Sequence, residues 1–98
     1  MGMTVSDIAT VCRSRSNEEE RHSDEAQAYG YVASYVEERS KITLEQLAHD
    51  LDLWIRVHKR SIERSRAQGS TLHTVYKQQA DVYQEVLSWA KGERSVKS

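Results

Sequence analysis

Residues 43–68 constrain the fold most, because they follow one helical period without interruption. Apolar or small side chains recur at steps of three and four from Leu44 to Ser65, while charged residues occupy the opposite face. Thr43 followed by Gln46 is typical of a capping box, and Gly69 is typical of the left-handed residue that ends a helix. The chain contains no proline that would break the pattern. We therefore expect one long amphipathic helix, with the rest of the chain packed along its apolar side.

Similar periods predict three further helices, over about 4–15, 17–39 and 70–91. Thr4 or Ser6 is expected to cap the first of these helices, and Asn17 to cap the second. Ser70 or Thr71 is expected to cap the last, and Gly92 to end it. Gly30 interrupts the second helix opposite its apolar arc, where it is expected to cost about 1 kcal/mol.

Short connections between these helices favour antiparallel neighbours. The sequence thus predicts an all-α protein: a small antiparallel helical bundle of three long helices (about 17–39, 43–68 and 70–91) with a short N-terminal helix (about 4–15). Residues 1–92 are expected to form a single domain, followed by a polar, disordered tail at 93–98. A thin bundle of this kind could also complete its core by pairing with a second copy, so a homodimer is a further expectation.

Composition narrows the class of protein. The chain has 98 residues, a net charge of −1 and a single cysteine, Cys12, which excludes a disulfide within the chain. Its longest apolar-leaning uncharged run, residues 26–36, is too short to span a bilayer. We therefore expect a soluble, cytoplasmic protein with no membrane association.

The residues that usually carry catalysis or bind metals do not form a recognisable motif. Glu19 and His22 have the spacing of a di-metal half-site, but Glu45 and His49 are one residue too far apart to supply the second half. The four glycines are isolated, so there is no glycine-rich phosphate loop. We expect no enzyme activity, no cofactor, no metal and no small-molecule substrate.

Two polar residues lie on predicted apolar faces. His58 is on the apolar side of the 43–68 helix, where a lone histidine is typical of a hydrogen-bonded core residue rather than a ligand. Gln79 lies in the middle of the apolar stripe of the 70–91 helix and requires a hydrogen-bonding partner if it is buried. The five tyrosines, at helical spacing, are interpreted as core or interface aromatics: Tyr29, Tyr31, Tyr35, Tyr76 and Tyr83.

Charge is distributed unevenly along the chain. Residues 1–55 carry eleven acidic and five basic residues, whereas residues 56–98 carry four acidic and nine basic residues. This division indicates two candidate binding faces. The basic face comprises Arg56, Lys59, Arg60, Arg64 and Arg66. The acidic face comprises Glu18, Glu19, Glu20, Asp24 and Glu25.

Residues 43–66 also resemble the helix-turn-helix of bacterial repressors, a resemblance carried by Leu47, Ala48, Leu51, Leu53, Arg60 and Ile62 after the start at Thr43. It implies a DNA-binding regulator whose second helix would present Arg56, His58, Lys59, Arg60, Arg64 and Arg66. Asp52 stands where that family has glycine in the turn, and Trp54 where it has a small capping residue. The unbroken apolar phase favours one straight helix, which could still bind RNA or phosphate groups through the same basic residues.

Taken together, these patterns favour a small non-catalytic helical protein that acts by binding another protein, as an adaptor, inhibitor or regulatory subunit. Charge would steer the partner, and apolar or tyrosine contacts would then hold it. Nucleic-acid binding, through a helix-turn-helix or a straight basic helix, is the alternative hypothesis.

Overall fold

The computed structural model describes residues 3–18, 24–39 and 41–93, which form four α-helices and no strand. The helices are α1 (Val5–Ser16), α2 (Asp24–Glu38), α3 (Leu44–Ala67) and α4 (Leu72–Ala90). The predicted all-α class, with a shorter first helix, is confirmed. The tail expected beyond residue 93 lies outside the described residues, as do Glu19 and His22, the two residues with the spacing of a di-metal half-site.

Most helix ends lie where local sequence signals place them. Thr43 caps α3 as expected: its hydroxyl accepts from the Gln46 amide at 3.1 Å, and the Gln46 side chain accepts from the Thr43 amide at 3.1 Å. Thr4 forms the same reciprocal pair with Asp7 at the start of α1. Gly69 and Gly92, which follow α3 and α4, have φ angles of 71° and 75°. Both glycines occupy the left-handed region that favours this residue.

The predicted cap at Asn17 is not tested, because the first-turn amides that it would cap belong to residues 19–23, outside the described residues. Asn17 ends α1, and its backbone N–H donates to the carbonyl of Arg13 at 3.1 Å. Its φ and ψ angles, −94° and 6°, lie in the bridge region, where helices commonly terminate. Within the described residues α2 covers 24–38 of the helix expected over 17–39, and residues 19–23 lie outside the described residues.

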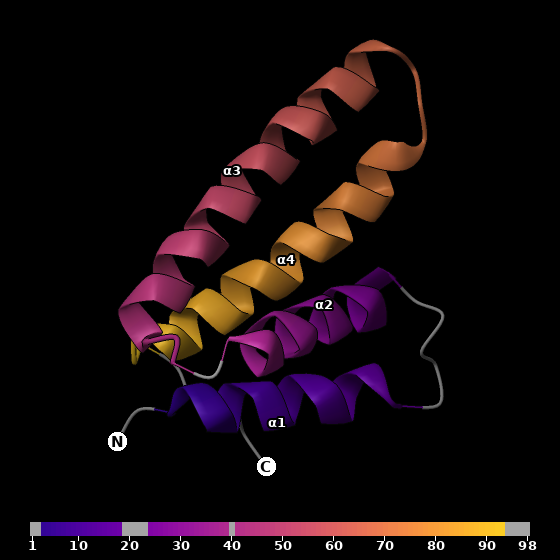
Figure 1. Cartoon of the computed structure of the whole chain (residues 1–98). Coiled ribbons are helices and arrows are strands. Elements are labelled where there is room, and N and C mark those ends of the chain that lie inside the picture. Colours follow the sequence, from indigo (N-terminus) through magenta and orange to yellow (C-terminus); the bar gives the residue numbers. More distant parts are fainter. Residues whose placement is uncertain (1–2, 19–23, 40, 94–98) are drawn as a thin grey trace.

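The chain folds as two helical hairpins, α1–α2 and α3–α4, which cross each other (Figure 1). Helix α4 packs against each of the other three helices, whereas α3 packs mainly against α4. The central element is therefore α4, and the expectation that the chain packs along residues 43–68 is wrong. The broad apolar face of α4 explains this, because it offers contact surface on two sides at once.

The hydrophobic core lies where the two hairpins meet. Its largest fully buried side chains come from all four helices: Ile8, Cys12, Val32, Leu47, Leu51, Val86 and Trp89. All seven belong to α1, α2, the first half of α3 or the second half of α4. The other half of the α3–α4 hairpin extends beyond this core (Figure 1).

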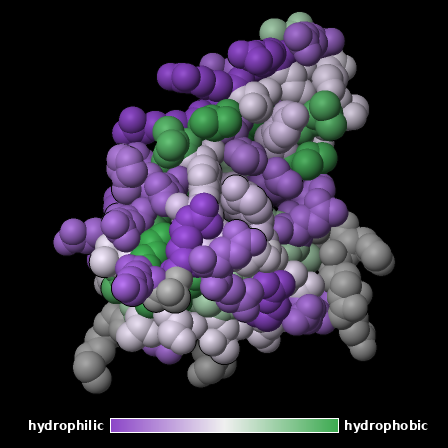
Figure 2. Space-filling view, in the orientation of Figure 1, coloured by the Kyte–Doolittle hydropathy of each residue, from purple (hydrophilic) through white to green (hydrophobic). Residues whose placement is uncertain are grey.

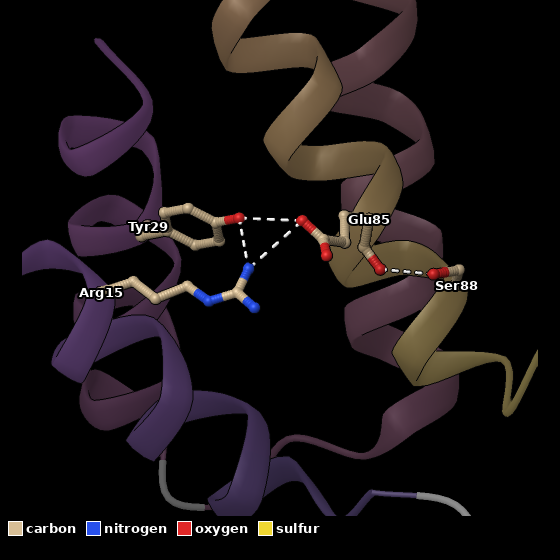
Figure 3. A network of polar contacts seen from close by, with 4 residues as sticks. All are labelled: Arg15, Tyr29, Glu85 and Ser88. Atoms are coloured by element: carbon tan, nitrogen blue, oxygen red, sulfur yellow. Dashed lines mark hydrogen bonds and ion pairs between the residues drawn. The ribbon is translucent and has the colours of Figure 1, made fainter. Parts of the chain in front are cut away.

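A polar network at the edge of the core joins three helices (Figure 3). Arg15 Nη1 of α1 donates to the hydroxyl of Tyr29 at 2.6 Å and to Oε2 of Glu85 at 3.3 Å. The Tyr29 hydroxyl donates to the same Glu85 oxygen at 2.9 Å. The guanidinium also lies 5.1 Å from the ring centroids of both Tyr29 and Trp89, a cation–π distance. Because each member touches the other two, the network fixes how α1, α2 and α4 are oriented.

Gly30 permits the close approach of α2 to the end of α1. A Cβ atom at Gly30 would lie 2.7 Å from Oγ of Ser16. We predict that Gly30→Ala alone changes the free energy of unfolding by less than about 0.5 kcal/mol, because the contact with Ser16 offsets the gain in helix propensity. The same change made in a Ser16→Ala background should stabilise the protein by about 1 kcal/mol. Urea unfolding of the four proteins measures both effects. Equal stabilisation in the two backgrounds would show that the Ser16 contact is irrelevant.

Candidate interaction surface

The projecting part of the α3–α4 hairpin, residues 56–79, is here named the arm. All residues of the arm are described, and Ser65 is the only one of them that is buried. Hydrophobic side chains lie at the surface of the arm among strongly hydrophilic ones (Figure 2). Val57 and Leu72 are about half exposed, at 51% each. The arm therefore has an apolar surface that no other described helix covers.

A groove of about 380 Å³ opens where the arm meets α2. Helix α2 contributes Gln27, Ala28 and Tyr31. The remaining lining residues come from α3 and α4: Trp54, Val57, His58, Gln79 and Tyr83. A separate, smaller hollow of about 130 Å³ lies nearer the tip of the arm and is lined mainly by polar residues, among them Ser61 and Arg64, with Leu72 and Tyr76. The larger groove is mostly apolar with a few polar groups, as is common in sites that accept a helix or a peptide.

Aromatic rings form one wall of the groove. Trp54 lies at the centre, with ring centroids 5.0 Å from Tyr31, 4.8 Å from Tyr35 and 5.5 Å from Tyr83, all in edge-to-face arrangements. Trp54 is half-buried, and Tyr31 is 53% exposed. Large aromatic side chains that are held in place but still reach solvent are typical anchors of protein interfaces.

His58 and Gln79 meet at the floor of the groove. His58 Nε2 lies 3.0 Å from Gln79 Oε1, and His58 Nδ1 lies 2.9 Å from the carbonyl oxygen of Trp54. The His58 ring also contacts Tyr76 and Tyr83 edge to face. The prediction that His58 is hydrogen-bonded is confirmed, and so is the need of Gln79 for a partner. That the two residues are each other's partner could not be read from the sequence.

The basic residues predicted as a binding face are all exposed on α3, but they lie at different distances around the helix from the groove. Arg60 and Arg64 follow Val57 by three and seven positions, so they lie on the side of α3 next to the groove. Arg64 lines the hollow near the tip. Arg56, Lys59 and Arg66 lie farther around the helix, and Arg56 pairs with Asp52 at 3.1 Å. Within the described part of the chain, neither Arg60 nor Arg64 forms an ion pair.

The acidic face is described only in part. Glu18 is exposed just after α1, while Asp24 and Glu25 lie in the first turn of α2, where acidic side chains favour the helix dipole. Glu19 and Glu20 lie outside the described residues. The acidic face as a whole therefore stays a prediction.

The turn required by the helix-turn-helix alternative is absent. Helix α3 runs without a break from Leu44 to Ala67, through Asp52 and Trp54. Trp54 packs against rings of α2 and α4, so it stabilises the contact between the hairpins instead of starting a second helix. The apolar phase of the sequence, which favoured a straight helix, indicated this outcome.

A second, larger hollow of about 800 Å³ lies at the α2–α3 connection. Its lining alternates between acidic and basic side chains, including Glu38, Arg39, Lys41 and Glu45, and it also contains His49. This mixture favours no single class of ligand. Among the described residues there is no group of three side chains suited to hold a metal ion, and no helix is long and apolar enough to cross a membrane.

Comparison of this chain with protein-family models, curated proteins and solved structures finds no match.

Proposed function

We propose that this protein is a non-catalytic binding protein, an adaptor, inhibitor or regulatory subunit, that captures an acidic amphipathic helix of another protein. The groove between the arm and α2 is the proposed docking site. The observation that carries the proposal is the arm itself, which presents apolar and aromatic side chains beside basic ones and has Ser65 as its one buried residue.

The dimensions and chemistry of the surface suit a helix. The groove of about 380 Å³ and the separate hollow of about 130 Å³ are both lined by residues of the antiparallel α3–α4 hairpin. A third helix laid over both would cover Val57, Leu72 and the exposed side of Tyr31. Its apolar side chains, at spacings of three and four, would contact Trp54 and Tyr31 in the groove.

Charge supports an acidic partner over a second copy of this chain. The arm contains six basic residues and one acidic residue, a net charge of +5. Two arms packed against each other would bring surfaces of the same sign together, whereas carboxylates on a partner helix could reach Arg60 and Arg64. Such exposed pairs contribute less than about 1 kcal/mol each, so they serve mainly to select the partner and speed its association.

The test uses two synthetic amphipathic peptides that share the same leucine face and carry either glutamate or lysine on the polar face. The chain has two tryptophans, so its ¹H–¹⁵N spectrum contains two indole signals, which a Trp54→Phe variant assigns. We expect the acidic peptide to shift the Trp54 signal, to leave that of buried Trp89 nearly unchanged, and to bind about tenfold more tightly than the basic peptide.

A matched pair of variants locates the charge preference. Arg60→Glu with Arg64→Glu should abolish the preference for the acidic peptide. Arg56→Glu with Lys59→Glu, which changes the net charge equally on the far side of α3, should retain most of it. If both variants lost the preference for the acidic peptide equally, the preference would depend on the net charge of the protein and not on the position of Arg60 and Arg64. If the acidic peptide did not bind to the unaltered protein, the proposal would be rejected.

Parallel measurements distinguish the alternatives. Sedimentation across a range of protein concentrations detects a homodimer. If Trp54→Ala dissociated such a dimer, the groove would be covered by a second copy of the chain, which would contradict the proposal that it binds another protein. Titration with mixed-sequence duplex DNA detects phosphate binding through its steep salt dependence. Tight DNA binding without a preference for the acidic peptide would favour the nucleic-acid hypothesis.

A further inference from the structure

His58 and Gln79 form a contact at the groove floor whose polarity depends on protonation. The Trp54 carbonyl can only accept a hydrogen bond, so Nδ1 of His58, 2.9 Å away, must carry a proton. A neutral imidazole carries one proton, and with that proton on Nδ1 its Nε2 can only accept. A neutral His58 therefore requires the NH₂ group of Gln79 to face Nε2.

The positively charged ring has the opposite requirement. With both nitrogens protonated, Nε2 donates, and the oxygen of Gln79 must face it, which is the orientation with Oε1 at 3.0 Å. Within the described residues the Gln79 amide has no other hydrogen bond. Since Gln79 also lines the groove, the amide atom that does not face His58 is available to a ligand there.

We infer that protonation of His58 switches the groove floor from a hydrogen-bond acceptor to a donor by reversing the amide of Gln79. With neutral His58, Gln79 presents its oxygen to the groove. With charged His58, it presents its NH₂ group and a positive charge lies behind it. This inference rests on the proposed function, because it names how the same groove selects its partner: an acceptor or carboxylate seated over Gln79 binds better as the pH falls.

The described groups that surround His58 supply no charge that would compete with Gln79 for its ring nitrogens. From α4, Tyr76 and Tyr83 contact the imidazole ring, and from α2 Tyr31 faces the same groove. Burial raises the pKa of Tyr83 to about 12, so its hydroxyl stays neutral in the physiological range. None of the ion pairs among the described residues involves His58.

The first test needs no ligand. Long-range ¹H–¹⁵N correlation of the histidine rings at about pH 8 identifies the tautomer of His58, and we expect the proton on Nδ1. As the pH is lowered until the His58 ring is protonated, the side-chain NH₂ signals of Gln79 should change together with the signals of that ring. A proton on Nε2 at high pH, or Gln79 signals that stay constant while His58 is protonated, would overturn the inference.

The second test uses the acidic peptide of the previous section. Its affinity for the unaltered protein should rise about tenfold from pH 8 to pH 6, a range above that in which glutamate side chains ordinarily titrate. His58→Phe, which keeps an aromatic ring against Tyr76 and Tyr83, should remove this dependence. His49→Gln, in the separate hollow beside α2, should retain it. If the peptide fails to bind at any pH, the proposed function is rejected. The inference about His58 and Gln79 is then still tested by the first experiment, through the tautomer of His58 and the NH₂ signals of Gln79.

Discussion

Raising the pH from 9 to 12 is expected to unfold this protein, because three groups are buried in their neutral forms. Burial raises the pKa of the Cys12 thiol from its ordinary value of 9.0 to about 12. Burial also raises the pKa of Tyr83 from 10.0 to about 12. The pKa of Tyr29 rises equally, to about 12, through burial and through the hydrogen bond that its hydroxyl donates to Glu85. Each group thus ionises more readily in the unfolded chain than in the folded one.

The sign of the effect follows from proton linkage. Stability from a raised pKa is fully present below the unfolded value and is lost as the pH rises toward the folded value. Each unit of difference corresponds to about 1.4 kcal/mol, so Cys12 alone accounts for a loss of about 4 kcal/mol across its interval. Domains of this size are typically stable by only about 5–15 kcal/mol, which makes the combined loss large enough for unfolding.

Urea unfolding at several pH values, followed by far-ultraviolet circular dichroism, measures this loss. Between pH 9 and 10 the thiol of the unfolded chain ionises before its tyrosines do, so Cys12→Ala should flatten the decline in that interval. The decline above pH 10 should remain in the variant because Tyr29 and Tyr83 cause it. The same slope between pH 9 and 10 with and without the thiol would show that Cys12 does not contribute.

Trp89→Ala is expected to lower the free energy of unfolding by about 3–5 kcal/mol, the largest effect of any single substitution proposed. Trp89 is 1% exposed and is the largest of the fully buried side chains. Its loss leaves a cavity where α4 meets the other hairpin and removes one of the two rings that contact the Arg15 guanidinium. Chemical denaturation at neutral pH, where Cys12 is neutral in both states, measures the effect.

Trp54→Ala is the matched control, since it removes the same side chain from a half-buried position. One side of Trp54 faces the groove, so less apolar surface returns to water and the surrounding rings can close over the space. We expect a clearly smaller loss of stability than for Trp89→Ala. Equal losses would mean that the groove wall supports the fold as much as the core does, and would weaken its assignment as an interaction surface.

The candidate site was predictable from the sequence only in part. The basic residues of α3 were identified and are exposed, and the hydrogen-bonding character of His58 and Gln79 was also foreseen. The groove was not, because it requires knowing that α2 packs mainly against α1 and α4 and leaves most of the arm uncovered. Nor did any local signal identify the network of Arg15, Tyr29 and Glu85, since Arg15 and Glu85 are 70 positions apart.

The sequence by itself determined the helices, their order and most of their ends. The capping pair Thr43–Gln46 and the terminal glycines act within one turn of the backbone, so their effect does not depend on the rest of the fold. The unbroken apolar phase through Asp52 likewise determined that α3 is one helix. Only the tertiary structure decided that α4 is the central element and that the arm projects. The physical reason is that an apolar stripe requires burial without specifying its partner, so the choice among stripes depends on how all four helices pack together.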